Sequence, residues 1–337
     1  MSFVQLPPLI LFAGRNDFLR WATGWSFQSF MVYHRWIARV MYFNAWYEVF
    51  LVLHLVFVSV FIVSLWYHCI DLGWMEYLYT SMAVWAFDRV VRILRLLTFG
   101  PNAKADIKII GDIIHIEVAA PFFQFAAKPG SYAYIHILRF NFWENHPFSL
   151  LQVRDGKCIF VAKAKNGLTL KLWNYLDRQP NKTATLRVWI DGLYGEKYQV
   201  EPFDTVLLIA GEIGISAIAS YADHLKNKIR NGQHVIVYWI VHSEDSLPAL
   251  RNTISDLQQG DVIDFHIYVT SKTNGISSDD AFNNIQHGRP DIYQVISETI
   301  RQANSSVAIA VCGPDSLNDA CRHAAASNVD RGKARIF

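Results

Sequence analysis

This sequence has a small net charge and few cysteines, and each of these properties excludes a class of partner or site. The 31 Lys and Arg residues nearly balance the 29 Asp and Glu residues, and a net charge of +2 argues against a nucleic-acid partner. The cysteines are scattered and include no CxxC pair: Cys69, Cys158, Cys312 and Cys321. This spacing argues against a cysteine-based zinc site and indicates a reducing compartment for the polar part of the chain.

Targeting and metal-binding patterns are also missing. No basic segment followed by an apolar one stands at Met1, so we expect no cleavable signal peptide. Outside the apolar region the histidines lack metal-ligand spacing such as HExxH. The sequons at Asn181 and Asn304 fall in a part that we expect to be cytoplasmic, and we interpret them as chance matches.

What the sequence does contain is an apolar stretch over residues 47–70, uncharged from Val49 to Tyr67. This length predicts a helix that spans a bilayer. Its histidines, His54 and His68, are fourteen residues apart, which places them about 40° apart around a helix and roughly 21 Å apart along it. Two imidazoles on one face, one near each leaflet, suit axial ligands of two haems. The alternative is two polar residues packed inside a helical bundle.

The flanking segments give an orientation. The short apolar run 8–13 cannot span, and arginines interrupt the next helix-like stretch, which predicts an interfacial helix there. A turn at 71–73 follows the spanning helix, and the next helix ends in the arginine-rich segment 88–95. Those arginines predict that this end is cytoplasmic, with His68 near the outer face and His54 near the inner face.

The remaining chain reads as two polar domains. From Lys104, short alternating runs punctuated by Gly, Asn and Pro predict an antiparallel β-barrel over 104–200. From Asp204, apolar strands alternate with helical segments, which predicts a parallel sheet covered on both faces over 204–337. We expect a loop or insertion at 271–290, where Ser, Asn and Asp are frequent.

The predicted barrel carries a candidate flavin site. A flavin needs a flat apolar slot, a donor at the ring edge and N–H groups for its pyrophosphate. Ser149 and nearby aromatic residues could supply the first two, and Lys163 with the turn 166–169 could supply the last. An ordinary strand beginning at a proline is the alternative. The candidate residues are Gly130, Tyr132, His146, Pro147, Phe148, Ser149, Lys163, Gly167 and Thr169.

The predicted sheet carries a candidate nucleotide site. Its first strand runs into a glycine-containing turn and then a helix, where a pyrophosphate can approach the helix N-terminus. The last strand ends in a Cys-Gly-Pro segment that could border a nicotinamide. The candidate residues are Gly211, Ile213, Gly214, Ile215, Ser216, Cys312, Gly313 and Pro314. Between the two domains, residues 191–195 predict a tight turn near both sites.

Taken in order, the motifs resemble those of fungal ferric/cupric-chelate reductases, within the ferric reductase and NADPH oxidase superfamily. They are GRNDFL, HRWIARV, YEVFLVLH, WYH, WAFDRVVRILR, PGSY, HPFSL, NGLT, DGLYG, AGEIGIS and CGPDSL. The resemblance implies a multi-domain fold: a partial helical transmembrane domain (1–100), an antiparallel FAD-binding barrel of the ferredoxin-reductase type (104–200) and a Rossmann-like α/β NAD(P)-binding domain (204–337).

The resemblance also implies an activity. NADPH would pass hydride to FAD, and single electrons would cross b-type haems to an extracellular ferric or cupric chelate for metal uptake. The family's haem-ligand positions match His34, His54 and His68. The implied location is the plasma membrane, with both nucleotide-binding domains cytoplasmic. No residue is assigned a catalytic role.

Several positions depart from the family pattern. A further haem histidine and a returning span are missing between Val40 and Tyr47. Glu212 stands where the family has a second glycine, and His242 where it often has an arginine for the 2′-phosphate. The family would also continue for a short stretch after Phe337. These departures keep two alternatives open: a shortened non-catalytic or regulatory membrane relative, and an NADPH oxidase that makes superoxide.

Overall fold

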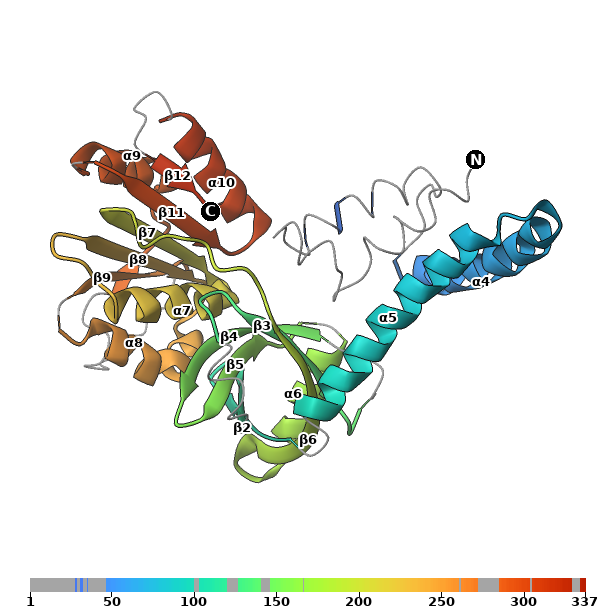
Figure 1. Ribbon diagram of the computed structural model, residues 1–337. Coiled ribbons are helices and arrows are strands. Elements are labelled where there is room, and N and C mark those ends of the chain that lie inside the picture. Colours follow the sequence, from blue (N-terminus) through green and yellow to red (C-terminus); the bar gives the residue numbers. More distant parts are fainter. Residues whose placement is uncertain are drawn as a thin grey trace. The chain divides into compact units, whose positions relative to one another are not determined.

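The computed structural model describes residues 47–99, 103–119, 127–140, 146–165, 167–260, 262–271, 285–303, 305–328 and 334–337, with Gln28, Met31, Val32 and Arg35. The chain divides into two compact units, Met1–Thr98 and Phe99–Phe337 (Figure 1). The predictions for residues 8–13 and for His34 fall outside the described residues.

A helical hairpin forms the described part of the first unit. Helix α4 (Tyr47–Leu72) and helix α5 (Met75–Phe99) are joined at Gly73, whose φ of 70° is readily adopted by glycine. The N–H of Trp74 donates to the carbonyl of Cys69 (3.3 Å). Leu65, Cys69 and Leu78 are buried between the helices. The predicted helix is therefore confirmed as a helix, whereas the predicted turn at 71–73 is shorter, because Asp71 and Leu72 still belong to α4.

Most of α4 faces outward with apolar side chains. Among the described residues, Leu53–Leu72 is the one helical segment long and apolar enough to cross a membrane, with a mean hydropathy of 2.0 and 11% of it buried. Leu55, Val60 and Val63 are 61%, 57% and 56% exposed. A surface of this kind suits hydrocarbon better than water.

The second unit begins with a closed six-stranded antiparallel barrel of order β1-β2-β5-β4-β3-β6 (Figure 1). Alternate residues of each strand fill its interior, as the period-two pattern predicted. Helix α6 (Leu168–Asp177) adds Leu168, Leu172 and Leu176 to this core. The strands are β1 (Lys104–Ile110), β2 (Ile113–Ala119), β3 (Tyr132–Ile137), β4 (His146–Arg154), β5 (Lys157–Lys163) and β6 (Thr183–Tyr194).

Two local predictions in the barrel were wrong. We predicted a tight turn at 191–195, but β6 continues to Tyr194, because Asp191 and Tyr194 still pair with Tyr134 and Tyr132 of β3 across a register shift. We also predicted a turn at 166–169, but Gly167 is the N-cap of α6, and Leu168 and Thr169 already belong to that helix. In both places glycine marks a change of backbone direction within or beside a regular element.

A six-stranded parallel sheet of order β10-β9-β8-β7-β11-β12 follows the barrel. Helices α7 and α8 pack on one face of the sheet, and α9 and α10 pack on the other (Figure 1). The strands are β7 (Thr205–Gly211), β8 (His234–Val241), β9 (Ile263–Val269), β10 (Ile285–His287), β11 (Val307–Cys312) and β12 (Ala334–Ile336). The helices are α7 (Ile215–Lys226), α8 (Arg251–Gln258), α9 (Ile292–Gln302) and α10 (Asp315–Ala326).

Neither edge strand of this sheet was predicted from the sequence. We expected a loop over 271–290, yet Ile285–His287 pairs with β9 as β10; residues 272–284 are outside the described part. Strand β12 pairs with β11 through only three residues. Such short edge strands are set by the neighbouring strand rather than by their own propensity.

The barrel and the sheet domain share a hydrophobic cluster. Ile113, Leu151 and Val161 of the barrel lie in the same buried cluster as α7. The N–H of Gly130 donates to the Ser220 hydroxyl of α7 (2.9 Å). A Cβ on Gly111 would lie 1.7 Å from the carbonyl oxygen of Asp245, so the β1–β2 turn sits directly on the loop after β8. This packing fixes the barrel against the sheet domain.

We expect His115 of β2 to weaken the fold in acid. Burial, followed by the charge of Lys108, lowers the pKa of His115 from 6.5 to about 4, although Glu117 opposes this. Between these values the unfolded chain binds a proton that the folded chain does not, so stability falls as pH drops from 6.5 to 4, by about 3 kcal/mol in total.

The measurement is the thermal unfolding midpoint of the detergent-solubilised protein across this pH range. His115→Val should lose less stability on acidification than the unsubstituted protein. An equal loss in both proteins would show that His115 does not titrate on unfolding.

Candidate flavin and nucleotide sites

The candidate flavin residues lie on the outer face of the barrel where β3 and β4 pair. Phe148 is buried in the barrel interior, whereas Pro147 is exposed and Ser149 half-buried on the opposite face. The register places Ser149 opposite Tyr132 and Pro147 opposite Tyr134. The strand pairing therefore brings together the two halves of the predicted site, PGSY and HPFS.

Three tyrosines form a cluster beside Ser149, which we call the tyrosine cluster (Tyr132, Tyr134 and Tyr194). Their ring centroids are 5.7, 6.0 and 5.8 Å apart. The Tyr194 hydroxyl donates to the buried Asp191 carboxylate at 2.5 Å, which holds that ring in place. Sequence reasoning had not singled out Tyr134, although it follows Tyr132 at the two-residue spacing of one strand face. The cluster places aromatic side chains beside Ser149, where a flavin ring needs apolar neighbours.

The N-terminus of α6 provides the place for an anion. Gly167 has a φ of 63° and, as glycine, brings no side chain to cap the first turn. The Thr169 hydroxyl accepts from the N–H of Lys165 at 3.2 Å and so lies within this turn. Helix N–H groups and the helix dipole favour a pyrophosphate there. The barrel thus fits FAD through a ring wall and a phosphate-binding helix end.

Lys163 has different partners from those we expected. Its ammonium lies 2.9 Å from Asp112 and 2.6 Å from Glu212, rather than standing free for the flavin pyrophosphate. Burial by itself would lower the pKa of Lys163, but the hydrogen bonds that its ammonium donates to the two carboxylates outweigh burial and raise the pKa. This contact was not predictable from the sequence, because the three residues are distant along the chain.

In the sheet domain, glycines allow the backbones of the loops after β7 and β11 to come into close contact. Strands β7 and β11 are neighbours, and their carboxyl ends carry Gly211 and Gly313. A Cβ on Gly313 would lie 3.0 Å from the Gly211 backbone, and one on Gly214 would lie 2.1 Å from the Cys312 carbonyl oxygen. Larger residues would push these loops apart, so the glycines shape the edge at which nucleotides bind in such sheets.

The start of α7 contributes backbone rather than side chains. Ile215 and Ser216 are buried, and the Ser216 hydroxyl donates to the carbonyl of Ile213 (2.9 Å). Gly214 caps α7 without a side-chain hydrogen bond. Burial raises the pKa of the half-buried Cys312 thiol, which suits a neutral neighbour of a nicotinamide rather than a nucleophile. The turn fits a dinucleotide through its backbone N–H groups.

Glu212 occupies the middle of this turn in a left-handed conformation, with φ of 53°. Its carbonyl accepts from the Trp239 indole N–H at 2.9 Å, and its Oε1 accepts from the N–H of His242 at 2.7 Å. Its Oε2 is the atom paired with Lys163. The carboxylate is therefore held at the end of β8 and neutralised in part by the barrel.

Two of the three candidate haem ligands lie on α4. His54 is half-buried and His68 exposed. The described ranges contain no group of three or more His, Cys, Asp and Glu side chains arranged to hold a metal ion. Both residues, and His34, stay predictions as haem ligands.

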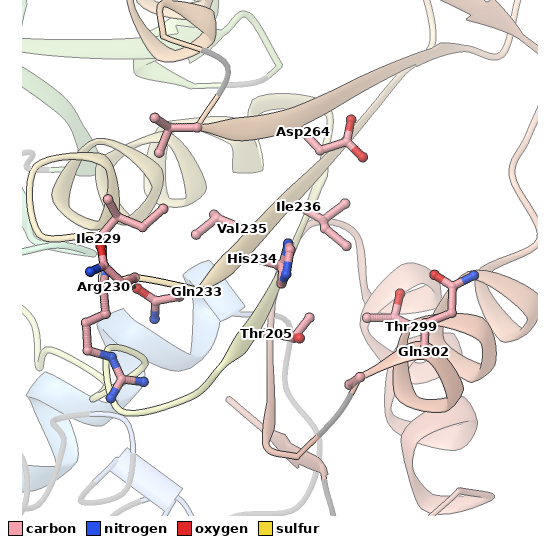
Figure 2. Close-up of a pocket in the computed structure, with 14 residues that line it drawn as sticks. Thr205, Ile229, Arg230, Gln233, His234, Val235, Ile236, Asp264, Thr299 and Gln302 are labelled. Atoms are coloured by element: carbon pink, nitrogen blue, oxygen red, sulfur yellow. Dashed lines mark hydrogen bonds between the residues drawn. The ribbon is translucent and has the colours of Figure 1, made fainter.

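A separate pocket of about 570 Å³ opens at the amino ends of the strands. Figure 2 shows Thr205 and His234 at the starts of β7 and β8, with Thr299 and Gln302 of α9 facing them. Ligands of open parallel sheets bind at the carboxyl ends. This pocket therefore lies at the opposite edge from Gly211 and Gly313 and is separate from the candidate nucleotide site.

Comparison with known proteins decides the family. Profiles described as "Ferric reductase like transmembrane component", "FAD-binding domain" and "Ferric reductase NAD binding domain" match residues 1–46, 100–198 and 203–326. The chain belongs to the fungal ferric reductase family. Its order of domains is the one that the motifs predicted.

Curated members of the ferric reductase family align over nearly the whole chain. "Ferric reductase transmembrane component 4" of Saccharomyces cerevisiae is 28% identical over 439 positions, covering 100% of this chain and 60% of that protein. "Probable ferric reductase transmembrane component" of Candida albicans is 31% identical over 417 positions, covering 98% and 62%. The chain thus spans less than two thirds of either relative. Because both alignments are longer than its 337 residues, many positions of these relatives fall opposite gaps inside this chain.

Solved structures confirm the fold of the second unit of this ferric reductase relative. A ferredoxin NADP+ reductase from Neisseria gonorrhoeae with bound FAD and NADP has a TM-score of 0.51 at 12% identity, covering 69% of this chain and 97% of that one. The ferredoxin reductase in carbazole 1,9a-dioxygenase gives 0.50 at 15% identity, covering 70% and 68%. The barrel followed by the parallel sheet is therefore of the ferredoxin-reductase type.

We expect Ser149→Ala to weaken FAD binding or to slow flavin reduction, because it removes a hydroxyl from the ring edge. Loss of one such hydrogen bond should change the FAD dissociation constant or the reduction rate by about twofold to tenfold. Flavin content and diaphorase rate measure the effect. Ser255→Ala, on the exposed face of α8, is the matched control; equal values in both variants would contradict this placement of Ser149.

We expect Gly214→Ala to impair nucleotide use while leaving flavin bound. The added Cβ would meet the Cys312 carbonyl oxygen at 2.1 Å and displace the turn before α7. The KM for the nucleotide should rise at least about tenfold, since small displacements at a reacting centre are costly. Steady-state kinetics with flavin content as the control measures this, and an unchanged KM would show that the turn does not contact the nucleotide.

Proposed function

We propose that the chain is a ferric-chelate reductase-type oxidoreductase that takes hydride from NAD(P)H onto FAD. The observation that carries the proposal is the shared packing of the two candidate sites. The barrel that bears Ser149 and the tyrosine cluster is fixed against α7, whose N-terminus is the nucleotide turn. Hydride transfer requires a nicotinamide held against a flavin, and this arrangement supports it.

The residues divide into those that hold the flavin and those that hold the nucleotide. Ser149 offers a hydroxyl to the flavin ring edge, the tyrosine cluster walls the ring, and Gly167 and Thr169 present the α6 N-terminus to the pyrophosphate. Gly211 and Gly214 bring backbone N–H groups to the second pyrophosphate, and Cys312 borders the nicotinamide. Bound FAD would supply the conversion from a two-electron donor to one-electron acceptors.

The more specific part of the proposal concerns the transmembrane domain, its haem and the electron acceptor. Residues 1–100 would form a partial transmembrane domain, with domains 104–200 and 204–337 in the cytoplasm of a plasma-membrane protein. Haem b bound through His34, His54 and His68 would pass electrons to a ferric or cupric chelate outside for metal uptake. Support comes from the apolar surface of α4 and from Arg89, Arg92 and Arg95, which lie in the second half of α5 before its last turn.

In a second candidate function, electrons reach the flavin but are not passed on to haem. The seven-position step from Val40 to Tyr47 leaves no room for a returning span between His34 and His54. Such a chain would oxidise NAD(P)H and reduce a soluble acceptor, or regulate a complete relative. This candidate keeps the flavin and nucleotide sites and omits haem.

The first measurement is a reduced-minus-oxidised absorption spectrum of membranes that contain the chain, with flavin quantified alongside. The full proposal expects haem b bands that weaken in His54→Leu and His68→Leu variants, together with chelate reduction. Flavin and diaphorase activity without haem bands would support the second candidate. Absence of flavin in folded protein would overturn both, and superoxide formed without added chelate would favour oxygen as the acceptor.

A further inference from the structure

The loop that follows β8 is acidic. Residues 242–250 contain Glu244 and Asp245 and no lysine or arginine. The carboxylate of Glu212 joins them, because its Oε1 accepts a hydrogen bond from the N–H of His242, the residue directly after β8. Two acidic residues therefore follow this strand within four positions, and the Glu212 carboxylate reaches its carboxyl end from a separate turn.

This strand end is the place where adenosine specificity is decided in sheets of this kind. In a β–α–β nucleotide-binding unit, here β7–α7–β8, the adenosine ribose lies at the carboxyl end of the second strand. A carboxylate there accepts a hydrogen bond from a ribose 2′-hydroxyl, whereas an arginine accommodates a 2′-phosphate. At this end the Glu212 carboxylate accepts from the backbone N–H of His242, and the residue at position 242 is a histidine rather than an arginine.

The lysine next to Glu212 does not reverse the local charge. Lys163 pairs with Asp112 (2.9 Å) as well as with Glu212 (2.6 Å), so one ammonium faces two carboxylates. Asp112 is itself held by the Ser246 hydroxyl at 2.8 Å, within the loop after β8. In the described loop 242–250, Glu244 and Asp245 add two further negative charges, and no lysine or arginine of that loop offsets them.

We propose that the nucleotide site selects NADH over NADPH, and that Glu212 is a specificity-determining residue. Its carboxylate accepts from the ribose 2′-hydroxyl of NADH and repels the 2′-phosphate of NADPH. We expect this charge to discriminate strongly between the two nucleotides, because the site is partly shielded from water. The inference rests on the proposed function, since it concerns the same nucleotide site.

The test is equilibrium binding of NAD+ and NADP+ to the detergent-solubilised full chain loaded with FAD, measured by titration calorimetry. The unsubstituted protein should bind NAD+ more tightly. Glu212→Gln keeps the size of the side chain and its acceptor for His242, so the affinity ratio should move toward NADP+ by about fivefold to tenfold. Glu298→Gln, on α9 at the other face of the sheet, is the matched control and should leave the ratio unchanged.

A double variant, Glu244→Gln with Asp245→Asn, tests the same charge without touching the turn before α7. It should move the ratio in the same direction as Glu212→Gln, and the relative rates of flavin reduction by NADH and NADPH should follow. Tighter NADP+ binding by the unsubstituted protein would overturn the inference and leave the proposed function standing. If flavin-loaded protein binds neither nucleotide, that result would instead contradict the proposed function.

Discussion

The second unit depends on the packing of the barrel against helix α7. Ile113, Leu151 and Val161 complete a cluster whose other members belong to the sheet domain, so neither surface could be exposed to water without cost. Gly130 approaches α7 so closely that a Cβ would lie 2.9 Å from the Tyr221 ring. Because α7 also begins at the nucleotide turn, the contact that stabilises the two domains sets the relation between the candidate flavin and nucleotide sites.

Close backbone approach is a second constraint, and it acts at the carboxyl edge of the sheet. Gly211 and Gly313 bring the ends of β7 and β11 together, and Gly214 sits against the Cys312 carbonyl. Glycine is needed at these three positions for lack of space, since none of them has a positive φ. Glu212, between two of them, does have a positive φ, and its hydrogen bonds to Trp239 and His242 hold that conformation.

Prediction from the sequence succeeded where one local pattern determines one element. The uncharged run of α4, the alternation in β1 to β6 and the strand–turn–helix of β7 and α7 all formed as expected. Prediction failed where a residue far away in the sequence determines the local structure. Tyr194 remains in β6 because Tyr132 pairs with it, β10 exists because β9 offers an edge, and Lys163 turns to Asp112 and Glu212. None of these partners is near in sequence, so no window of residues could reveal them.

The pairing of Lys163 with Glu212 also explains how an acidic residue can occupy the turn that we propose binds a pyrophosphate. An unpaired carboxylate beside a helix N-terminus would compete with the phosphate for the same N–H groups. Here the barrel supplies the counter-ion, and the N–H of His242 supplies a hydrogen bond, so the carboxylate is satisfied at the end of β8. The pyrophosphate then meets the N–H groups of α7 without that competitor. The lysine could offset a single negative charge, but it is already shared with Asp112. Among the described residues around Glu212, an additional phosphate would therefore meet carboxylates and a lysine that is already paired.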